Sequence, residues 1–342
     1  MGMFFKKEIK KVTSHPIFNI KKQMAGIYIH IPFCKQRCSY CAFYSTTLYN
    51  IREQYVNALC KELVMRKDYA GGATIETIYF GGGTPSTLSI EQLQRICNTI
   101  YATYPVSDTA EVTIECNPDD LTTDFLSQLK ELPFNRISMG VQSFNDTQLK
   151  RLGRRHNADK ARQAVKNARE AGYDNISIDL IFGLPQLTDE LWDDTLEKAL
   201  AISSRGNLPK HISAYQLSVE EGSMLEKMIS KGMCAEAPEE ECRRQYEKLC
   251  RVLQQAGYEH YEISNFAMPG YQAKHNSAYW KHVPYVGLGP GAHSFLDGKR
   301  LWNADDLSAY LKAGSNGDFS EIRGSETLDQ EQKKIEKIMD YL

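Results

Sequence analysis

Three cysteines fall within eight residues of this 342-residue chain, at Cys34, Cys38 and Cys41. They follow an apolar run at residues 27–33 that is typical of a strand, and no fourth cysteine follows at metal-finger spacing. Structural zinc takes four ligands, whereas thiolates crowded on one loop suit an iron-sulfur cluster. Because three thiolates leave one iron of a [4Fe-4S] cluster open, the spacing predicts a cluster that also binds a small molecule.

Two other interpretations of these cysteines are packing residues and half of a zinc ribbon. The remaining cysteines suit a second half poorly, because none forms a CxxC pair and Cys60, Cys97, Cys242 and Cys250 lie in helical patterns. Nine cysteines without a secretory signal indicate a reducing compartment, where thiols stay free to bind metals. We therefore expect a cytoplasmic protein.

The composition excludes several classes of protein. With 42% hydrophobic and 25% charged residues, neither disorder nor a fibre is indicated. The net charge of -2 gives no basic field, so a nucleic-acid partner is not expected. No apolar run reaches the roughly eighteen residues of a membrane span. The lysine-rich residues 1–23 are expected to form a disordered extension.

Six strand-like runs alternate with amphipathic helical patterns. This alternation predicts repeated β/α units around a parallel sheet. Six units are fewer than the eight of a closed barrel, so we expect an α/β fold, a partial (β/α)6 barrel with its ligands at the carboxyl ends of the strands. The expected strands are Ile27–Ile31, Thr77–Phe80, Glu111–Glu115, Arg136–Val141, Asn175–Phe182 and His211–Leu217.

Helix punctuation supports this pattern. Ser89 with Gln92 forms a candidate capping box, Thr188 is a candidate N-cap, and Gly172 and Gly257 stand where helices commonly end in a left-handed residue.

The pattern changes after about residue 220. A charged helix is expected at Glu239–Gln255 and a strand at Tyr258–Ile263, followed by a region rich in glycine and aromatic residues. We expect a barrel core at residues 24–220 and a smaller α+β domain at 221–342. A helix is expected at Leu328–Leu342, and it runs to the last residue, so this second domain is expected to be incomplete.

Polar residues mark several of the expected strand ends. Gly81–Ser86 follows a strand and exposes backbone groups, although such a turn is often only a turn. Glu115 and Asp179 lie in apolar runs, where a carboxylate needs a partner, either a ligand or a salt bridge inside the barrel. Arg154 is a candidate partner for a carboxylate, although adjacent basic residues often form a solvated face.

Taken together, these motifs resemble the radical S-adenosylmethionine (SAM) superfamily, whose CxxxCxxC pattern is present as Cys34-Lys-Gln-Arg-Cys38-Ser-Tyr-Cys41. The resemblance implies a [4Fe-4S] cluster on Cys34, Cys38 and Cys41 whose open iron binds S-adenosyl-L-methionine. It also implies a set of residues that contact S-adenosylmethionine. These residues are Tyr28, Gly82, Gly83, Thr84, Glu115, Gln142, Arg154 and Asp179.

Within that superfamily the chain resembles the branch of the oxygen-independent coproporphyrinogen III oxidases and their relatives, the haem chaperones. The resemblance covers roughly residues 26–310. The shared stretches are Tyr28–Cys34, Phe80–Ser86, Glu115–Pro118, Ser138–Phe144, Leu152–His156, Ile178–Pro185, and His275-Asn276 with Tyr279-Trp280.

One position favours the chaperones over the oxidases. The oxidases carry a fourth cysteine two residues after the third, where this chain has Phe43. The resemblance therefore implies a protein that binds haem and hands it to acceptor haem proteins, with respiratory, membrane-associated proteins as candidate acceptors. A radical enzyme that oxidises a porphyrinogen propionate is the alternative. No catalytic residue is assigned.

His275 is the best candidate haem ligand, because Tyr279 and Trp280 beside it offer flat apolar surface. The competing interpretation is that this motif packs the domain junction, since the oxidase-type relatives share it. The weaker candidates are His293, His211 and Cys234.

Overall fold

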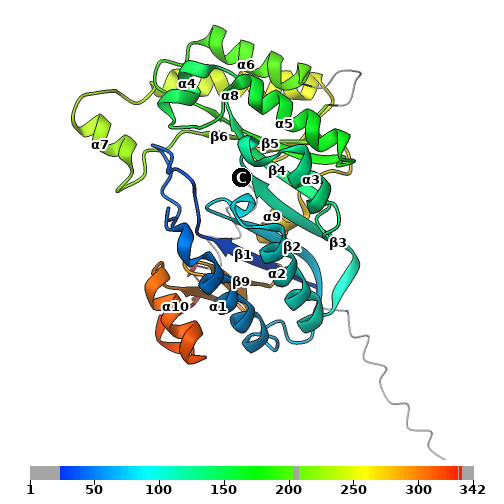
Figure 1. The fold of residues 1–342 in the computed structure, drawn as a ribbon. Coiled ribbons are helices and arrows are strands. Elements are labelled where there is room, and N and C mark those ends of the chain that lie inside the picture. Colours follow the sequence, from blue (N-terminus) through cyan, green and yellow to red (C-terminus); the bar gives the residue numbers. More distant parts are fainter. Residues whose placement is uncertain (1–23, 203–207, 330, 333–342) are drawn as a thin grey trace, which may run out of the picture.

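The computed structural model describes residues 24–202, 208–329 and 331–332. Six consecutive strands pair in parallel and in chain order, and they curve into an open sheet (Figure 1). All six predicted strands are confirmed, several with longer ends. They are β1 (Met24–Ile31), β2 (Thr74–Gly82), β3 (Val106–Cys116), β4 (Arg136–Gln142), β5 (Asn175–Phe182) and β6 (His211–Gln216).

Helices connect these strands and cover the outer face of the sheet (Figure 1). Ser89 and Gln92 form the predicted capping box, and the Thr188 hydroxyl caps its helix. Gly172 and Gly257 adopt the predicted positive φ. The helices are α1 (Arg52–Met65), α2 (Ile90–Thr103), α3 (Thr123–Leu129), α4 (Asp146–Arg151), α5 (Ala158–Glu170) and α6 (Asp189–Ala201), with short 3-10 turns η1 (Tyr49–Ile51), η2 (Pro85–Thr87) and η3 (Pro118–Asp120).

The last third of the chain extends the sheet at both ends. Beyond β6 lie the antiparallel strands β8 (Asn265–Ala267) and β7 (Glu259–Glu262). Beyond β1 lie β9 (Tyr285–Leu288), parallel to it, and then the antiparallel β10 (His293–Leu296), β11 (Lys299–Asn303) and β12 (Arg323–Thr327). The fold is thus a partial (β/α)6 barrel with α+β additions, and over the described residues its twelve-stranded sheet is not closed.

The remaining helices are α7 (Met224–Ser230), α8 (Glu239–Gln255), α9 (Lys274–Trp280) and α10 (Leu307–Asn316), with the turn η4 (Ser320–Ile322). The predicted charged helix is therefore confirmed as α8, and the strand predicted at Tyr258–Ile263 is β7. Residues 1–23 lie outside the described part of the chain, and so does most of the helix predicted at Leu328–Leu342. A division of the chain near residue 220 stays a prediction.

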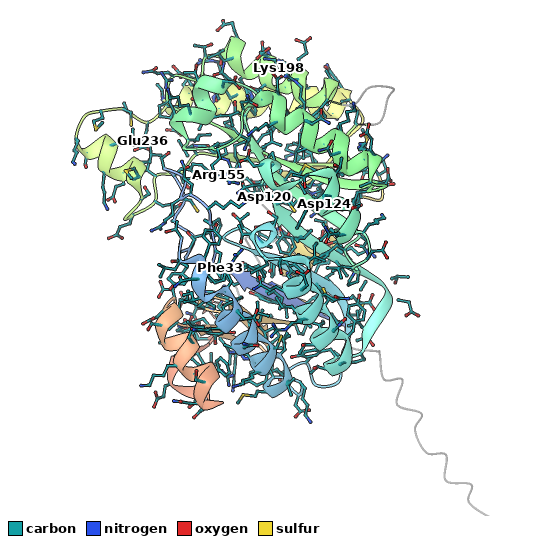
Figure 2. The ribbon with its side chains drawn as sticks, viewed as in Figure 1. Phe33, Asp120, Asp124, Arg155, Lys198 and Glu236 are labelled. Carbon is teal, nitrogen blue, oxygen red and sulfur yellow. The ribbon has the colours of Figure 1, made fainter. Side chains whose placement is uncertain are left out.

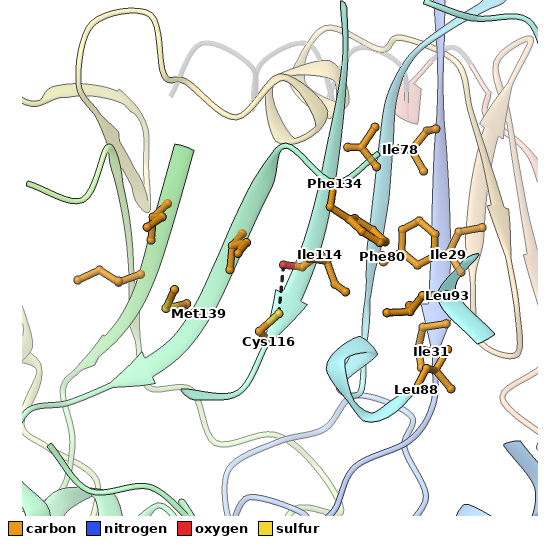
Figure 3. Close-up of a cluster of buried hydrophobic side chains, with 14 of the residues drawn as sticks. Ile29, Ile31, Ile78, Phe80, Leu88, Leu93, Ile114, Cys116, Phe134 and Met139 are labelled. Carbon is orange, nitrogen blue, oxygen red and sulfur yellow. Dashed lines mark hydrogen bonds between the residues drawn. The ribbon is translucent and has the colours of Figure 1, made fainter. Parts of the chain in front are cut away.

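The core lies between the sheet and its outer helices. Side chains alternate along each strand, so Ile29 and Ile31 of β1 and Ile78 and Phe80 of β2 face the helices, as Figure 3 shows. Phe80 packs edge-on against Phe134 at 5.0 Å between ring centroids. The opposite face of the same strands carries polar residues, which places the chemistry on the concave side.

Helix α9 lies against that concave side. The Glu111 carboxylate of β3 accepts the backbone N–H groups of Lys274 and His275, both at 3.1 Å, and so fixes the start of the helix. None of the described helices combines the length and the apolar character that crossing a membrane requires.

Candidate functional site

The loop that follows β1, residues 33–48, carries the three predicted cluster ligands, and we call it the cysteine loop. Phe33 and Thr46 pair across its base, and the Cys34 N–H donates to the Thr46 carbonyl at 2.9 Å. Its tip is fixed from outside, because the Ser39 N–H donates to the Leu152 carbonyl at 3.1 Å and the Gln36 amide donates to the Gly153 carbonyl at 3.0 Å. The Leu-Gly-Arg-Arg-His stretch thus serves as a support for the cysteines.

Hydrogen bonds join two of the cysteines through three other residues. The Thr84 hydroxyl lies 3.5 Å from Cys34 Sγ and accepts from the Asn117 side-chain amide at 3.3 Å. Arg154 donates to Asn117 Oδ1 and, at 3.2 Å, to Cys38 Sγ. Its guanidinium also donates to the Gly140 carbonyl at 2.6 Å. The ends of β2, β3 and β4 are thereby tied to the cysteine loop.

A buried carboxylate reinforces the same loop. Asp120 of η3 accepts from Lys35 at 2.5 Å and from the Ser86 hydroxyl at 2.9 Å. Arg155 lies 3.3 Å from it, and Figure 2 labels both residues beside the cysteine loop, which Phe33 begins. These contacts hold the loop in place without using its thiols.

The glycines at the end of β2 are required by close packing. Gly82 has φ +102°, and a Cβ there would lie 2.6 Å from the His30 ring. A Cβ on Gly83 would lie 2.8 Å from the Ile31 carbonyl. The Gly83 and Thr84 N–H groups donate to the carbonyls of Ile31 and Phe33, so they join the two loops. The stretch from Gly82 to Thr84 therefore brings β2 against the first cysteine.

The two predicted strand carboxylates face the concave side, where Glu115 also has a hydrogen bond with the Gly82 backbone and Asp179 one with the Ser213 side chain. Glu115 accepts from the Tyr79 hydroxyl at 2.7 Å, and Asp179 accepts from the Ser138 hydroxyl at 3.3 Å. Removal from water raises the pKa of Glu115 to about 7 and that of Asp179 to about 6. A ligand with ammonium or hydroxyl donors would stabilise the ionised form of each.

Tyr28 and Gln142 complete the predicted set. The Tyr28 ring stacks on Tyr79 at 6.2 Å between centroids, and its hydroxyl lies 3.2 Å from His30 Nδ1. Gln142 ends β4 in the left-handed region with φ 68°, which a non-glycine residue rarely adopts. The amide nitrogen of Gln142 lies close to Gly140. A Cβ added at Gly140 would lie 2.9 Å from this nitrogen, so the position favours glycine.

The cysteine thiols suit a cluster by their chemistry. Burial raises the pKa of Cys34, and it raises the pKa of Cys41 to about 11, so both thiols need a cation to ionise. In residues 24–202, 208–329 and 331–332, no three His, Cys, Asp or Glu side chains are arranged to hold a single metal ion. Thiolates of a cluster bind different irons, and the Arg154 and Thr84 donors beside the sulfurs are the kind that tune such a cluster.

His275 lies at the end of the concave side that is distant from the cysteines, where its ring stacks on Tyr79 at 5.1 Å and on Tyr28 at 6.5 Å between centroids. Its Nδ1 pairs with the Thr77 hydroxyl at 2.8 Å and its Nε2 with the Tyr279 hydroxyl at 2.9 Å. Its ring also stands beside Gly26, so it lies on the order of 20 Å from the cysteine loop along β1. To bind iron, this ring would have to give up one of its two hydrogen bonds. His211 is similarly engaged, by Ser177 at 2.8 Å and by Tyr261 at 2.7 Å.

Two residues of the site had no predicted role. Asn117 lies within the Cys-Asn-Pro stretch after β3, and an asparagine directly after a buried strand was the available signal. The Tyr79 side chain lies on the concave face of β2, as do Thr77 and Gly81. The alternation of side chains along the strand therefore places it beside Glu115.

An open parallel barrel with three cysteines on the loop after its first strand defines a class of cofactor-binding proteins. Similarity to known families and structures places this chain in the same class. The family model of the radical SAM superfamily matches residues 28–199. The solved structure of coproporphyrinogen III oxidase (HemN) from Escherichia coli superposes with a TM-score of 0.78 at 23% identity, covering 93% of this chain and 74% of that one. This likeness shows the fold.

Two curated relatives narrow the family. The "Heme chaperone HemW" of Synechocystis sp. is 41% identical over 292 residues, which cover 83% of this chain and 69% of that protein. Its namesake in Bacillus subtilis is 37% identical over 318 residues, which cover 90% and 82%. The chain belongs to the radical SAM superfamily and, within it, to the family of these HemW proteins. Membership of this superfamily implies a [4Fe-4S] cluster and S-adenosylmethionine as cofactors.

Proposed function

We propose that this protein is a cytoplasmic haem chaperone that binds haem and transfers it to acceptor haem proteins. The main support is its similarity to relatives named heme chaperone HemW in Synechocystis, Bacillus subtilis and Lactococcus lactis, which are 36–41% identical over more than four fifths of the chain. Phe43, in the position where the oxidase-type relatives carry a fourth cysteine, supports the same choice.

In this proposal Cys34, Cys38 and Cys41 hold the cluster. When bound, the cluster supplies one electron for cleavage of the sulfonium of S-adenosylmethionine. Arg154 holds the ends of β3 and β4 against the cysteine loop, so that the concave side keeps its shape around the ligand. Glu115 and Asp179 accept hydrogen bonds from the donors of S-adenosylmethionine, which lowers the free energy cost of their burial.

The surface of the cysteine loop also fits a protein that meets partners. The Phe43 side chain is 69% exposed, and Leu48 of the same loop is 57% exposed. Large exposed apolar side chains on a loop that carries a cofactor offer contact area to an acceptor protein. The acceptors in this proposal are haem proteins, respiratory ones among them.

The decisive experiment uses the full chain purified without oxygen. Iron and acid-labile sulfide are quantified, haem is titrated while the Soret band is followed, and the loaded protein is mixed with a haem-free acceptor. We expect about four irons per chain, a shifted Soret band and recovery of acceptor activity. Absence of a Soret shift, or of transfer, would refute the chaperone function.

A parallel incubation tests the alternative activity. Coproporphyrinogen III, a reductant and S-adenosylmethionine are added, and formation of protoporphyrinogen would mean that the protein is an oxidase. The variant Cys38→Ala should lose the visible absorbance of the cluster, whereas Cys60→Ala, on α1, should keep it. Equal spectra of the two variants would remove Cys38 from the ligand set.

A further inference from the structure

A cavity of about 730 Å³ lies where the two ends of the sheet approach α9. Its lining comes from β6, from the turn between β7 and β8, from α9, and from β9, β10 and β11. The volume falls within the range of ligand sites, roughly 300–1,000 Å³. None of the predicted cluster or S-adenosylmethionine residues lines this cavity, whereas Tyr279, Trp280 and the weaker haem-ligand candidate His293 do.

The walls of the cavity are aromatic. Tyr279 and Trp280 project from α9, and each is 38% exposed. Tyr285 of β9 stands edge-on to Tyr279 at 4.7 Å between ring centroids, and Phe295 pairs with it across the β9–β10 ladder. Partly exposed rings around a cavity of this size suit a large flat ligand, because each ring offers a face for stacking.

One end of the cavity carries positive charge. Arg300 of β11 lines this end. The pKa of His293 is lowered first by burial and next by the positive charge of Arg300. Glu262 lines the opposite side, where its carboxylate accepts the Ser264 N–H at 3.1 Å. The cavity thus has a cationic side at Arg300 and an acidic side at Glu262.

The cavity also borders the predicted S-adenosylmethionine residues. Tyr215, at the end of β6, lines it, and the pKa of this tyrosine is raised by burial and next by the charge of Asp179. The pKa of Tyr279 is also raised, first by burial, then by two neighbouring tyrosines, and then by the charge of Glu115. A ligand in the cavity would therefore lie on the same concave side as the cofactor carboxylates.

We propose that this cavity is the cargo site, which holds a planar macrocycle by stacking on Tyr279, Trp280 and Phe295 and binds one of its carboxylates through Arg300. The inference rests on the proposed function and adds the place and the mode of binding. Imidazoles for the iron lie on the same walls: His282 and His293 line the cavity, and His275 lies behind Tyr279.

The test compares four variants of the full chain by titration with hemin and with hemin dimethyl ester, which lacks free carboxylates. Ser264→Trp fills the cavity and should weaken hemin binding at least tenfold. Trp280→Ala removes a stacking face and should weaken hemin binding about tenfold. This variant still tests the cavity if Ser264→Trp does not fold. Arg300→Gln should lose about tenfold for hemin and less than threefold for the ester, because only hemin offers a carboxylate.

Arg243→Gln is the matched control, because its guanidinium binds Glu240 and Glu247 on the exposed face of α8. It should bind both ligands like the wild type. If the wild type binds hemin and the three cavity variants bind it within threefold, the cavity is not the site and the chaperone function stands. If the wild type binds no hemin, the proposed function itself fails.

Discussion

Two glutamates on the two faces of the sheet have opposite surroundings. Glu62 of α1 is completely buried, and both of its oxygens are saturated. One accepts from Arg66 and Asn303, each at 2.8 Å, and the other accepts from the Gly289 N–H at 2.9 Å and the Tyr310 hydroxyl at 2.7 Å. Glu115, on the concave side, accepts from only the Tyr79 hydroxyl and the Gly82 backbone among the described residues, and burial raises its pKa to about 7.

The difference separates a structural carboxylate from one that waits for a ligand. Four donors, from the residues that follow α1 and β9 and from β11 and α10, leave Glu62 no capacity for anything else, so its role is to fix the last third of the chain against the first. Glu115 has capacity left over and is costly to ionise, which is the usual condition of a binding residue. Three predictions test this contrast.

The largest effect is expected for Glu62→Ala. The change removes an acceptor from each of the buried side chains Arg66, Asn303 and Tyr310, and removing one partner of a buried ion pair costs about 3–5 kcal/mol. Urea unfolding of the cofactor-free protein measures this loss. Glu53→Ala, in an exposed pair with Arg95, should cost at most about 1 kcal/mol. Equal losses in the two variants would contradict a structural role for Glu62.

A smaller loss of stability and a larger loss of binding are expected for Arg154→Met. The substitution leaves the Gly140 carbonyl and Asn117 without a donor, at a cost of about 1–3 kcal/mol. After cluster reconstitution, affinity for S-adenosylmethionine measured by equilibrium dialysis should fall about tenfold or more. Arg151→Met, whose guanidinium binds Gln186 at 2.5 Å, is the control. Unchanged affinity in Arg154→Met would remove this residue from the site.

The smallest effect is a pH dependence that Glu115→Gln should remove. The folded pKa of Glu115, about 7, lies above its ordinary value of 4.5, so the folded protein binds the extra proton. Its contribution to the free energy of unfolding is therefore full below about pH 4.5 and is lost as pH rises to 7. The difference in urea midpoint between wild type and variant should change over this window. A constant difference from pH 4.5 to 7.5 would show that Glu115 does not titrate there.

The parallel barrel was predictable because its strands have regular patterns. Asn175–Phe182 is apolar at most positions and is bounded by turn residues, so its limits followed directly. The short strands β9–β12 lie in a region rich in glycine and aromatic residues with no clear period, and their pairing with β1 depends on contacts distant in sequence.

The candidate site divides in the same way. The cysteines and the strand carboxylates have a chemical signal in the chain itself. The partners of Thr84 and Arg154 do not, since Asn117 meets them only where three strand ends converge. Glu62 lies in a helical run at residues 54–64, where nothing distinguishes it from a surface glutamate.

The unclosed sheet has a further consequence. Its terminal strands, β12 and β7, share no backbone hydrogen bonds in the described part of the chain, and the cavity described above lies between the two ends of the sheet. Separating the margins would therefore break no ladder between them, and only rings and loops would have to shift. The proposed cargo site therefore has one side that is not walled by a ladder of strands, whereas in a closed barrel a ladder would have to break to open that side.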